Sequence, residues 1–221
     1  MKTTDKSRGA SKYLLVFTLV ALLLTPLAVS ATPVSHGPRV QENKALVLNQ
    51  QMRKLWEDHV TWTRVVIISF AAGLPDLDSA VNRLLQNQAD IGNAIKPYYG
   101  AAAGDQVTAL LREHIVLAAD LLSAAKAADA AKVATVQAQW YANADDIAAF
   151  LHNANPKKWP LEEMQHMMHS HLDLTLQEAT ARLGGDWQGD INAYDAVHEE
   201  ILQMADMLSW GIVKQFPQQF R

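Results

Sequence analysis

Three histidines, His59, His114 and His171, recur at intervals of 55 and 57 residues in closely similar surroundings. Each has apolar residues four and three positions before it and a large apolar residue three positions after it. On a helix these positions share one face with the histidine, so we expect each imidazole to lie on a buried face. Three such imidazoles can bind zinc, copper or iron, which makes these histidines the candidate metal ligands.

A second pattern follows each histidine: an amide residue, two further residues, an aspartate that lies 31 to 35 residues after the histidine, and an apolar residue. The aspartates are Asp90, Asp146 and Asp206. In an antiparallel helical hairpin, equal residue counts on either side of the turn mean equal height, because each residue rises by about 1.5 Å. We therefore expect each aspartate to lie level with its histidine, either as a metal ligand or as the acceptor that fixes the imidazole tautomer.

The same layer has two other interpretations. Buried histidines need hydrogen-bond partners, so the His–Asp pairs would also serve as purely structural contacts that are repeated with each hairpin. A His–Asp pair can also act in general acid–base catalysis, and Arg64 lies nearby on an otherwise apolar stretch. A buried Arg64 requires a carboxylate, for which Asp90 or Asp146 would serve, and that ion pair would turn the layer into a salt-bridge network.

A run of methionines and histidines leads into His171. The accessory candidates in it are Met164, His166, Met167, Met168 and His169. Thioether and imidazole groups together favour copper, Cu(I) especially. The alternative is that the methionines fill an irregular core while His166 and His169 are solvated.

The elements that must position these residues are helices. Helix-forming residues dominate the chain after residue 44, and turn signals such as Gly73-Leu74-Pro75-Asp76 and Gly184-Gly185-Asp186 interrupt them at regular intervals. The predicted helices span residues 45–72, 77–96, 105–127, 131–153, 160–183 and 187–215, to within about 2–4 residues at each boundary.

Short connections between these helices predict antiparallel neighbours, and so an all-α, six-helix up-and-down bundle that forms one domain over residues 45–217. The recurring histidines and aspartates add a finer expectation. They indicate that the bundle is built from three helical-hairpin repeats of about 56 residues each.

The first 31 residues are typical of a secretory signal peptide. Four basic residues precede an apolar run that extends from Tyr13 to Leu24, and small residues ending at Ala31 offer a cleavage site. A retained membrane anchor is the alternative, although the run is shorter than the roughly 20 residues that span a bilayer. We expect cleavage after Ala31, a flexible leader over residues 32–44, a periplasmic or secreted protein, and no membrane span in what remains.

The composition excludes several kinds of site. None of the 221 residues is cysteine, which excludes disulfides, thiolate metal ligands and a cysteine nucleophile. The formal charge of −4 gives no nucleic-acid footprint. The sequence has no Gly-rich phosphate loop after a strand, no Gly-x-Ser-x-Gly elbow and no His-Glu-x-x-His motif.

Three segments resemble a family of small bacterial exported all-helical proteins. They are residues 56–64, with the pattern Trp-x-x-His-Val-x-Trp-Thr-Arg, residues 141–148, and residues 211–217. The resemblance covers most of the chain after residue 31. It implies the helical fold and carries no established activity.

These features favour binding over catalysis. We expect an exported helical protein that binds a small ligand or a metal ion through the histidine–aspartate layer, with copper, zinc or iron as the candidate metals. The alternatives are a structural or protein-interaction module and an acid–base enzyme that uses a His–Asp pair with Arg64. The six tryptophans would either line a ligand pocket between helices or anchor the core.

Overall fold

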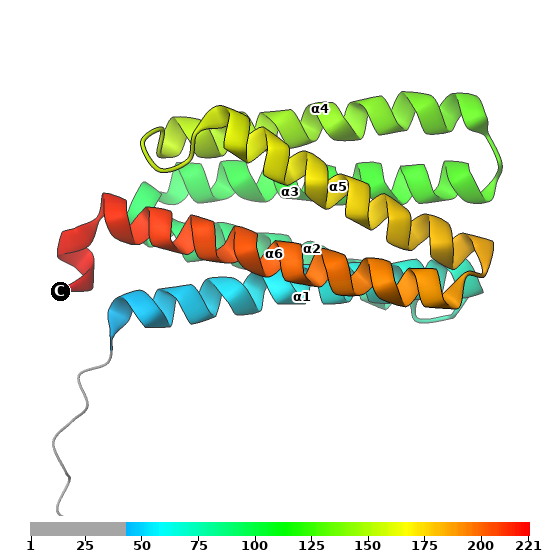
Figure 1. The fold of residues 1–221 in the computed structure, drawn as a ribbon, viewed down its shortest axis with the longest axis horizontal. Coiled ribbons are helices and arrows are strands. Elements are labelled where there is room, and N and C mark those ends of the chain that lie inside the picture. The colour runs from blue at the N-terminus through cyan, green and yellow to red at the C-terminus, as the bar shows by residue number, and fades with distance from the viewer. Residues whose placement is uncertain (1–42) are drawn as a thin grey trace, which may run out of the picture. The chain divides into compact units, whose positions relative to one another are not determined.

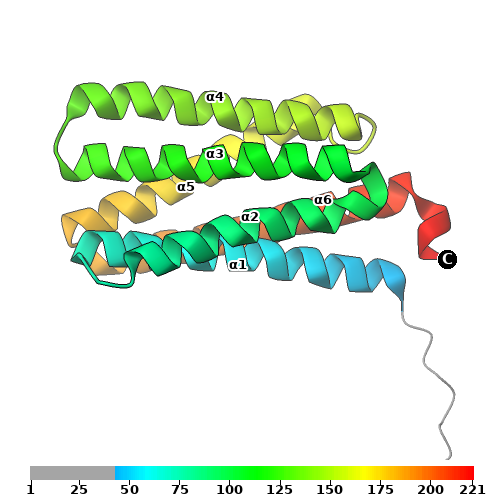
Figure 2. The same ribbon diagram turned by 180° about the vertical axis from the view of Figure 1, so that it is seen from behind.

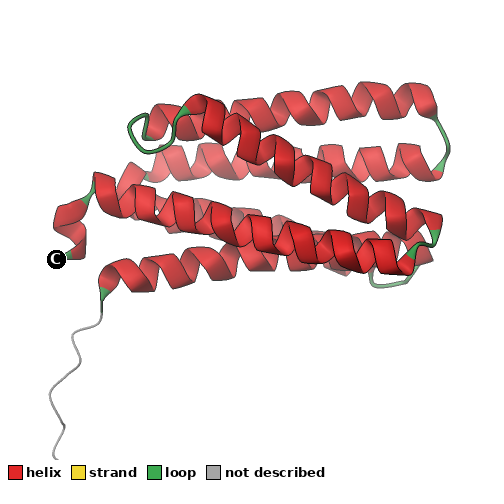
Figure 3. Ribbon diagram, viewed as in Figure 1, coloured by secondary structure: helices red, strands yellow, loops and turns green. Residues whose placement is uncertain are grey.

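Residues 43–221, which are the residues that this computed structural model describes, fold almost entirely into α-helices (Figure 3). The six helices are α1 (Lys44–Ala72), α2 (Leu77–Tyr99), α3 (Ala101–Lys126), α4 (Ala130–Ala154), α5 (Leu161–Gly184) and α6 (Trp187–Gln215), and a short 3-10 helix, η1 (Pro217–Phe220), follows them. The prediction of an all-α bundle of six helices is confirmed, and the expected boundaries agree closely with the observed ones.

Aspartates fix where two of the return helices begin. The Asp129 carboxylate accepts a hydrogen bond from the main-chain N–H of Lys132 at 3.0 Å, and Asp186 accepts one from Gly189 at 2.9 Å. Such caps satisfy N–H groups that the first turn of a helix leaves without partners. The turn signals that precede α4 and α6 in the sequence therefore act as helix starts.

The junction between α2 and α3 is tighter than the sequence predicts. Pro97 suggests a break after residue 96, yet α2 continues to Tyr99 and α3 begins at Ala101. Gly100 alone makes the turn, with φ 86° and ψ 168°, a conformation that glycine adopts without steric cost. Pro97 lies in the last turn of α2, so its missing N–H affects only the end of that helix.

Each helix packs on the next one in the chain, and α6 packs back on α1, so the six helices form a closed ring (Figures 1 and 2). The helix α5 crosses the bundle obliquely and also contacts α1 (Figure 1). The C-terminus returns to the start of α1, where Lys44 Nζ donates to the main-chain oxygen of Arg221 at 2.9 Å. Side chains from all six helices therefore meet in a shared interior.

Two glycines let α2 and α3 approach closely. A Cβ on Gly104 would lie 2.6 Å from the carbonyl oxygen of Gly92, and a Cβ on Gly92 would overlap the Thr108 hydroxyl. We expect Gly92→Ala to lower the free energy of unfolding by about 1–3 kcal/mol, the usual cost of forcing a methyl group into a packed contact. Urea unfolding followed by circular dichroism measures this change.

The matched control for this variant is Gly184→Ala on α5. A Cβ at Gly184 meets nothing within 4 Å. Alanine there should leave stability unchanged or raise it by up to about 1 kcal/mol, because it restricts the unfolded chain. An equal loss of stability in both variants would contradict the role given to the α2–α3 contact.

The predicted signal peptide, residues 1–31, and nearly all of the predicted leader, residues 32–44, lie outside the described residues. The chain from residue 43 onward belongs to one compact unit, which contains the predicted domain 45–217. In this part of the chain, no helix is both long enough and apolar enough to cross a bilayer.

Candidate functional site

A row of five aromatic rings crosses the interior of the bundle. Three of the rings are those of His59 on α1, His171 on α5 and His114 on α3, each 2–4% exposed. The ring centroids of His59 and His171 are 5.7 Å apart, and those of His171 and His114 are 6.4 Å apart. Trp56 lies 5.8 Å from His59 at one end of the row, and Trp140 lies 5.1 Å from His114 at the other. The structure thus brings the three predicted histidines together.

Each histidine is held through Nδ1 by a side chain 29 residues later, on the other helix of the same hairpin. The three contacts are His59 Nδ1 to Gln88 Nε2 at 3.3 Å, His114 Nδ1 to Asn143 Oδ1 at 3.0 Å, and His171 Nδ1 to Glu200 Oε2 at 3.1 Å. Three equivalent hairpins would produce such a constant interval. It supports the hairpin repeat, which remains a prediction.

The expected pairing of the histidines with aspartates is wrong. Asp90 accepts a hydrogen bond from Gln86 at 3.0 Å, Asp206 pairs with Arg53 at 2.7 Å, and Asp146 is exposed. Counting residues from each turn estimates height but not direction. Each residue rotates a helix by about 100°, so Asp90, two residues beyond Gln88, points to nearly the opposite face of α2, and Asp146, three residues beyond Asn143, lies about 60° further round α4.

Hydrogen-bond directions assign the proton on His59. The Gln88 amide nitrogen donates to the carbonyl oxygen of Leu84 at 2.8 Å, and a carbonyl can only accept, so the nitrogen end of this amide is fixed. The same nitrogen lies 3.2 Å from Asn87 Oδ1 and 3.3 Å from His59 Nδ1, and because an amide nitrogen can only donate, its position favours Nδ1 of His59 as an acceptor. His59 consequently carries its proton on Nε2.

The other two histidines have the opposite tautomer. The Asn143 amide nitrogen donates to the carbonyl oxygen of Leu110 at 3.2 Å, so the amide oxygen faces His114 and accepts from its Nδ1–H. The Glu200 carboxylate likewise accepts from Nδ1 of His171. In their neutral forms, His114 and His171 therefore leave Nε2 unprotonated.

This arrangement differs from the three-histidine metal site that the sequence suggests. A metal binds an unprotonated ring nitrogen, which His114 and His171 offer at Nε2 and His59 does not. His59 would have to change tautomer and lose its hydrogen bond from Gln88. Within residues 43–221, no group of three or more histidine, aspartate or glutamate side chains is arranged to hold a metal ion.

Burial keeps the ends of the histidine row neutral. It lowers the pKa of His114 to about 3 and the pKa of His59 well below its usual value, and repulsion from His171 lowers both further. The hydrogen bonds with Gln88 and Asn143 act in the opposite direction and are smaller effects. The interior of the bundle therefore contains two uncharged imidazoles at neutral pH.

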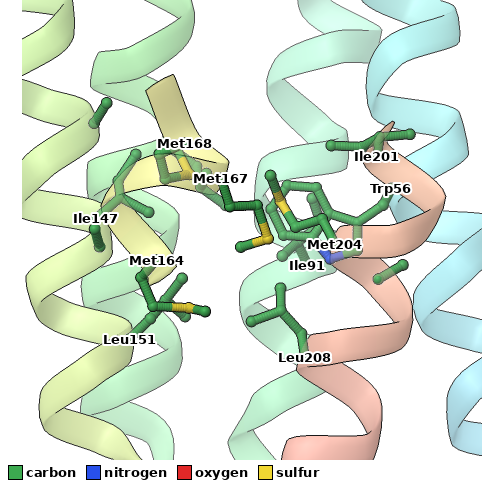
Figure 4. Packing of buried hydrophobic residues seen from close by; sticks show 14 of the residues in the cluster. Trp56, Ile91, Ile147, Leu151, Met164, Met167, Met168, Ile201, Met204 and Leu208 are labelled. Carbon is green, nitrogen blue, oxygen red and sulfur yellow. The ribbon is translucent and has the colours of Figure 1, made fainter. Parts of the chain in front are cut away.

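The methionine and histidine side chains preceding His171 separate onto different faces of α5. Met164, Met167 and Met168 are buried, and Figure 4 shows them packed in the apolar core with Met204 of α6. The accessory histidines point elsewhere: His166 is exposed, and His169 Nε2 lies 3.0 Å from an Asp145 carboxylate oxygen. The proposed copper donor set is not assembled, because consecutive residues of a helix point in directions about 100° apart.

Arg64 is held by carboxylates other than those that the sequence suggests. Its guanidinium lies 2.8 Å from Glu178 on α5 and 2.9 Å from Asp190 on α6, both of which are 1% exposed, whereas Asp90 and Asp146 are not its partners. Arg182 balances the second carboxylate at 3.1 Å. This network joins α1, α5 and α6. The His–Asp pair beside Arg64, on which the acid–base alternative rests, is not formed.

A cavity of about 250 Å³ lies among α1, α2, α3, α4 and α5. Most of its lining residues are alanine, valine, leucine or isoleucine, and none of the lining residues is charged. The polar lining residues are Thr63, Gln137, Thr175 and Thr180, and Trp140 also lines the cavity. An apolar space with a few polar groups in its wall is the usual form of a small-molecule site.

One end of this cavity lies next to the histidine row. Thr63 and Thr175 line the cavity, and their hydroxyls donate at 2.8 Å to the carbonyl oxygens of His59 and His171, one turn earlier on the same helices. Trp140 belongs both to the cavity wall and to the row of rings. The histidines themselves lie behind this end and do not line the cavity.

Several functional residues were not predicted from the sequence. The histidine partners Gln88, Asn143 and Glu200 carry a signal that could have found them, since each follows its histidine by the same 29 residues. The cavity carries no such signal, because small apolar residues line it and the same residues form ordinary helix contacts.

The segments that resemble a bacterial family hold residues of this site. Residues 56–64 of α1 include one tryptophan and one histidine of the ring row as well as Arg64, and residues 141–148 of α4 include Asn143. The resemblance itself remains an expectation. In comparisons of the chain with protein-family models, with curated proteins and with solved structures, no match was found.

Proposed function

We propose that this protein is exported and binds a small, largely apolar molecule in the cavity among α1 to α5. The observation that carries the proposal is the cavity itself, about 250 Å³ of apolar space inside a helical ring. A buried apolar cavity of about 150 Å³ holds benzene, so this one has room for a somewhat larger molecule. The basic and apolar pattern of residues 1–31 supports export.

The absence of charge in the cavity wall restricts the ligand. An ion transferred from water into this space would lose its hydration without gaining a partner of opposite charge. An uncharged molecule loses little and gains the burial of its apolar surface, at about 25 cal/mol per Å². The ligand class that fits is therefore an uncharged molecule with one ring or a short branched chain.

Toluene is a suitable first probe of the cavity. We expect it to raise the melting temperature of the wild-type protein in a saturable way, by about 2–4 °C for each kcal/mol of binding free energy. Ala118→Leu should abolish this shift, because Ala118 lines the cavity and the larger side chain fills part of it. Calorimetric titration gives the dissociation constants.

Ala138→Leu is the matched control, because Ala138 is exposed on α4 and the same substitution there adds its bulk outside the cavity. Toluene binding that survives Ala138→Leu but not Ala118→Leu supports the proposal. Binding that is absent from the wild-type protein, or equal in both variants, contradicts it. Export is tested separately by sequencing the N-terminus of the protein isolated from the cell envelope, which should begin at Thr32.

Metal binding is a second candidate, favoured by one observation: His114 and His171 each have Nδ1 beside an oxygen acceptor, the arrangement that directs Nε2 of a neutral imidazole toward a metal. Elemental analysis of protein purified without chelator tests it. Stoichiometric copper, zinc or iron that disappears in His114→Ala/His171→Ala and persists in Ala118→Leu would favour this function over the cavity. A protein that binds neither metal nor toluene would instead fit a structural or protein-interaction module.

A further inference from the structure

The cavity among α1 to α5 adjoins a second hollow, which lies on the surface at the end of the bundle where α1, α3 and α5 terminate (Figure 1). Ala125 and Leu183 line both spaces, so these two side chains form the boundary between them. The hollow has a volume of about 460 Å³. A molecule longer than the cavity can therefore extend past Ala125 and Leu183 into the hollow.

The cavity is elongated along the helices that form it. Its lining residues on α5 run from Thr175 to Leu183, about 12 Å along the helix axis at a rise of about 1.5 Å per residue. Those on α3 run from Ile115 to Ala125, about 15 Å by the same measure. Both rows end at the boundary with the hollow. A straight aliphatic chain fits such a space with one of its ends directed at the hollow.

The hollow differs from the cavity in its charge. Its charged lining residues are Lys126 and Arg182, and none of the described residues that line it is acidic. Lys126 is exposed, and the Arg182 side chain is 21% exposed. Trp187, which is 59% exposed, adds an aromatic ring to the same wall. An anionic group that would lose its hydration in the uncharged cavity therefore meets two cations in the hollow.

Both cations keep N–H groups free after their contacts within the protein. Lys126 has three N–H donors and contacts the carbonyl oxygens of Phe70 at 2.7 Å and Ala71 at 3.4 Å. Arg182 has five N–H donors, and it contacts Asp190 through Nη1 at 3.1 Å. A carboxylate in the hollow can therefore accept hydrogen bonds from both side chains without displacing these contacts.

We infer that the ligand is an aliphatic carboxylate, whose chain occupies the cavity and whose anionic head lies in the hollow beside Lys126 and Arg182. This inference rests on the proposed function and extends it, because the part of the molecule inside the cavity remains uncharged. Burial of the chain supplies most of the binding free energy. The two cations make the site prefer an anionic head over a neutral one.

Octanoate and 1-octanol test the assignment of the head. The two molecules have the same number of carbons and differ only at the first, which is a carboxylate in one and an alcohol in the other. The quantity to measure is the ratio of their dissociation constants, 1-octanol over octanoate, by calorimetry on the whole protein. We expect Lys126→Met to lower this ratio about three- to fivefold, because it removes one of the two cations that face the head.

Lys132→Met is the matched control. Lys132 is exposed at the same end of the bundle, and its substitution removes the same charge without altering the lining of the hollow. The ratio for this variant should remain near the wild-type value. A measurement that needs no variant is the salt dependence: added salt should weaken the binding of octanoate much more than that of 1-octanol, because it screens the exposed cations.

Ala118→Leu tests the assignment of the chain, since it fills part of the cavity and should abolish the binding of both molecules. Octanoate binding that survives Ala118→Leu overturns the inference, as does a ratio that falls equally in Lys126→Met and Lys132→Met or in neither. If 1-octanol then still binds in the wild-type protein and not in Ala118→Leu, the cavity remains a binding site. Failure of toluene, 1-octanol and octanoate to bind overturns the proposed function as well.

Discussion

Replacing Arg64 with methionine is expected to lower the free energy of unfolding by about 3–5 kcal/mol, the usual cost of removing one partner from a buried ion pair. The change leaves Glu178 without its cation at a position where the side chain is 1% exposed. Burial already raises the pKa of Glu178 to about 7, against the opposing effect of Arg64. Urea unfolding at pH 8, where this carboxylate is ionised in the wild-type protein, measures the effect.

A compensated variant separates charge imbalance from lost packing. In Arg64→Met/Glu178→Leu one cation and one anion are removed together, and Asp190 keeps its 3.1 Å ion pair with Arg182. We expect this double variant to regain most of the stability, because well-packed apolar side chains often replace a buried ion pair at little cost. A double variant as unstable as the single one would contradict the electrostatic account.

The surface control for this pair is Arg53→Met. Arg53 pairs with Asp206 at 2.7 Å, but the two side chains are 38% and 41% exposed. Water screens such a pair, and its loss should cost less than about 1 kcal/mol. Comparable losses at Arg53 and Arg64 would show that burial does not govern the contribution of these ion pairs.

The helices could be predicted from the sequence because their signals are local. An aspartate such as Asp129 or Asp186 caps the helix that follows it, whatever the rest of the chain does. The layer of three histidines could also be predicted, since the apolar positions around His59, His114 and His171 determine a helix face and the hairpin lengths determine a height.

The partners of these histidines could not be predicted, for a reason that is equally physical. The aspartates were chosen by height alone. Asp146 stands three residues beyond the true partner Asn143, about 60° further round the helix, and is exposed. The partners of Arg64 were missed because α5 and α6 supply them, more than a hundred residues away. The helices that lie against α1 are determined by the closure of the ring. A local sequence pattern does not predict this closure.

Acid is expected to destabilise the protein through its buried histidines. Between pH 6.5 and pH 4.5 His114 should remove about 2 kcal/mol of stability, and His59, whose pKa is lowered by burial in the same way, should add to this loss. Their folded pKa values lie below the ordinary value, at about 3 for His114. The unfolded chain therefore binds protons that the folded chain does not bind. The stability that they confer is complete above pH 6.5 and is lost as the pH falls.

Glu178 acts in the opposite direction over the same range. Its folded pKa of about 7 lies above its ordinary value, so here the folded chain takes up a proton that the unfolded chain does not. Acidification to pH 4.5 therefore restores about 2 kcal/mol of stability, which offsets the loss through His114 and leaves the loss through His59 as the net effect of the three groups. Urea unfolding at pH 6.5, 5.5 and 4.5 measures the combined change.

Two variants should move this acid sensitivity in opposite directions. His114→Gln removes a group that stays unprotonated in the folded protein, and it should reduce the loss of stability between pH 6.5 and pH 4.5 by about 2 kcal/mol. Glu178→Gln removes the group that compensates, and it should increase this loss by about 2 kcal/mol. His166→Gln, at an exposed position, should change nothing. Because other carboxylates contribute equally to all these proteins, the differences between variants isolate the buried groups, and changes of the same sign in His114→Gln and Glu178→Gln would contradict their opposed titration.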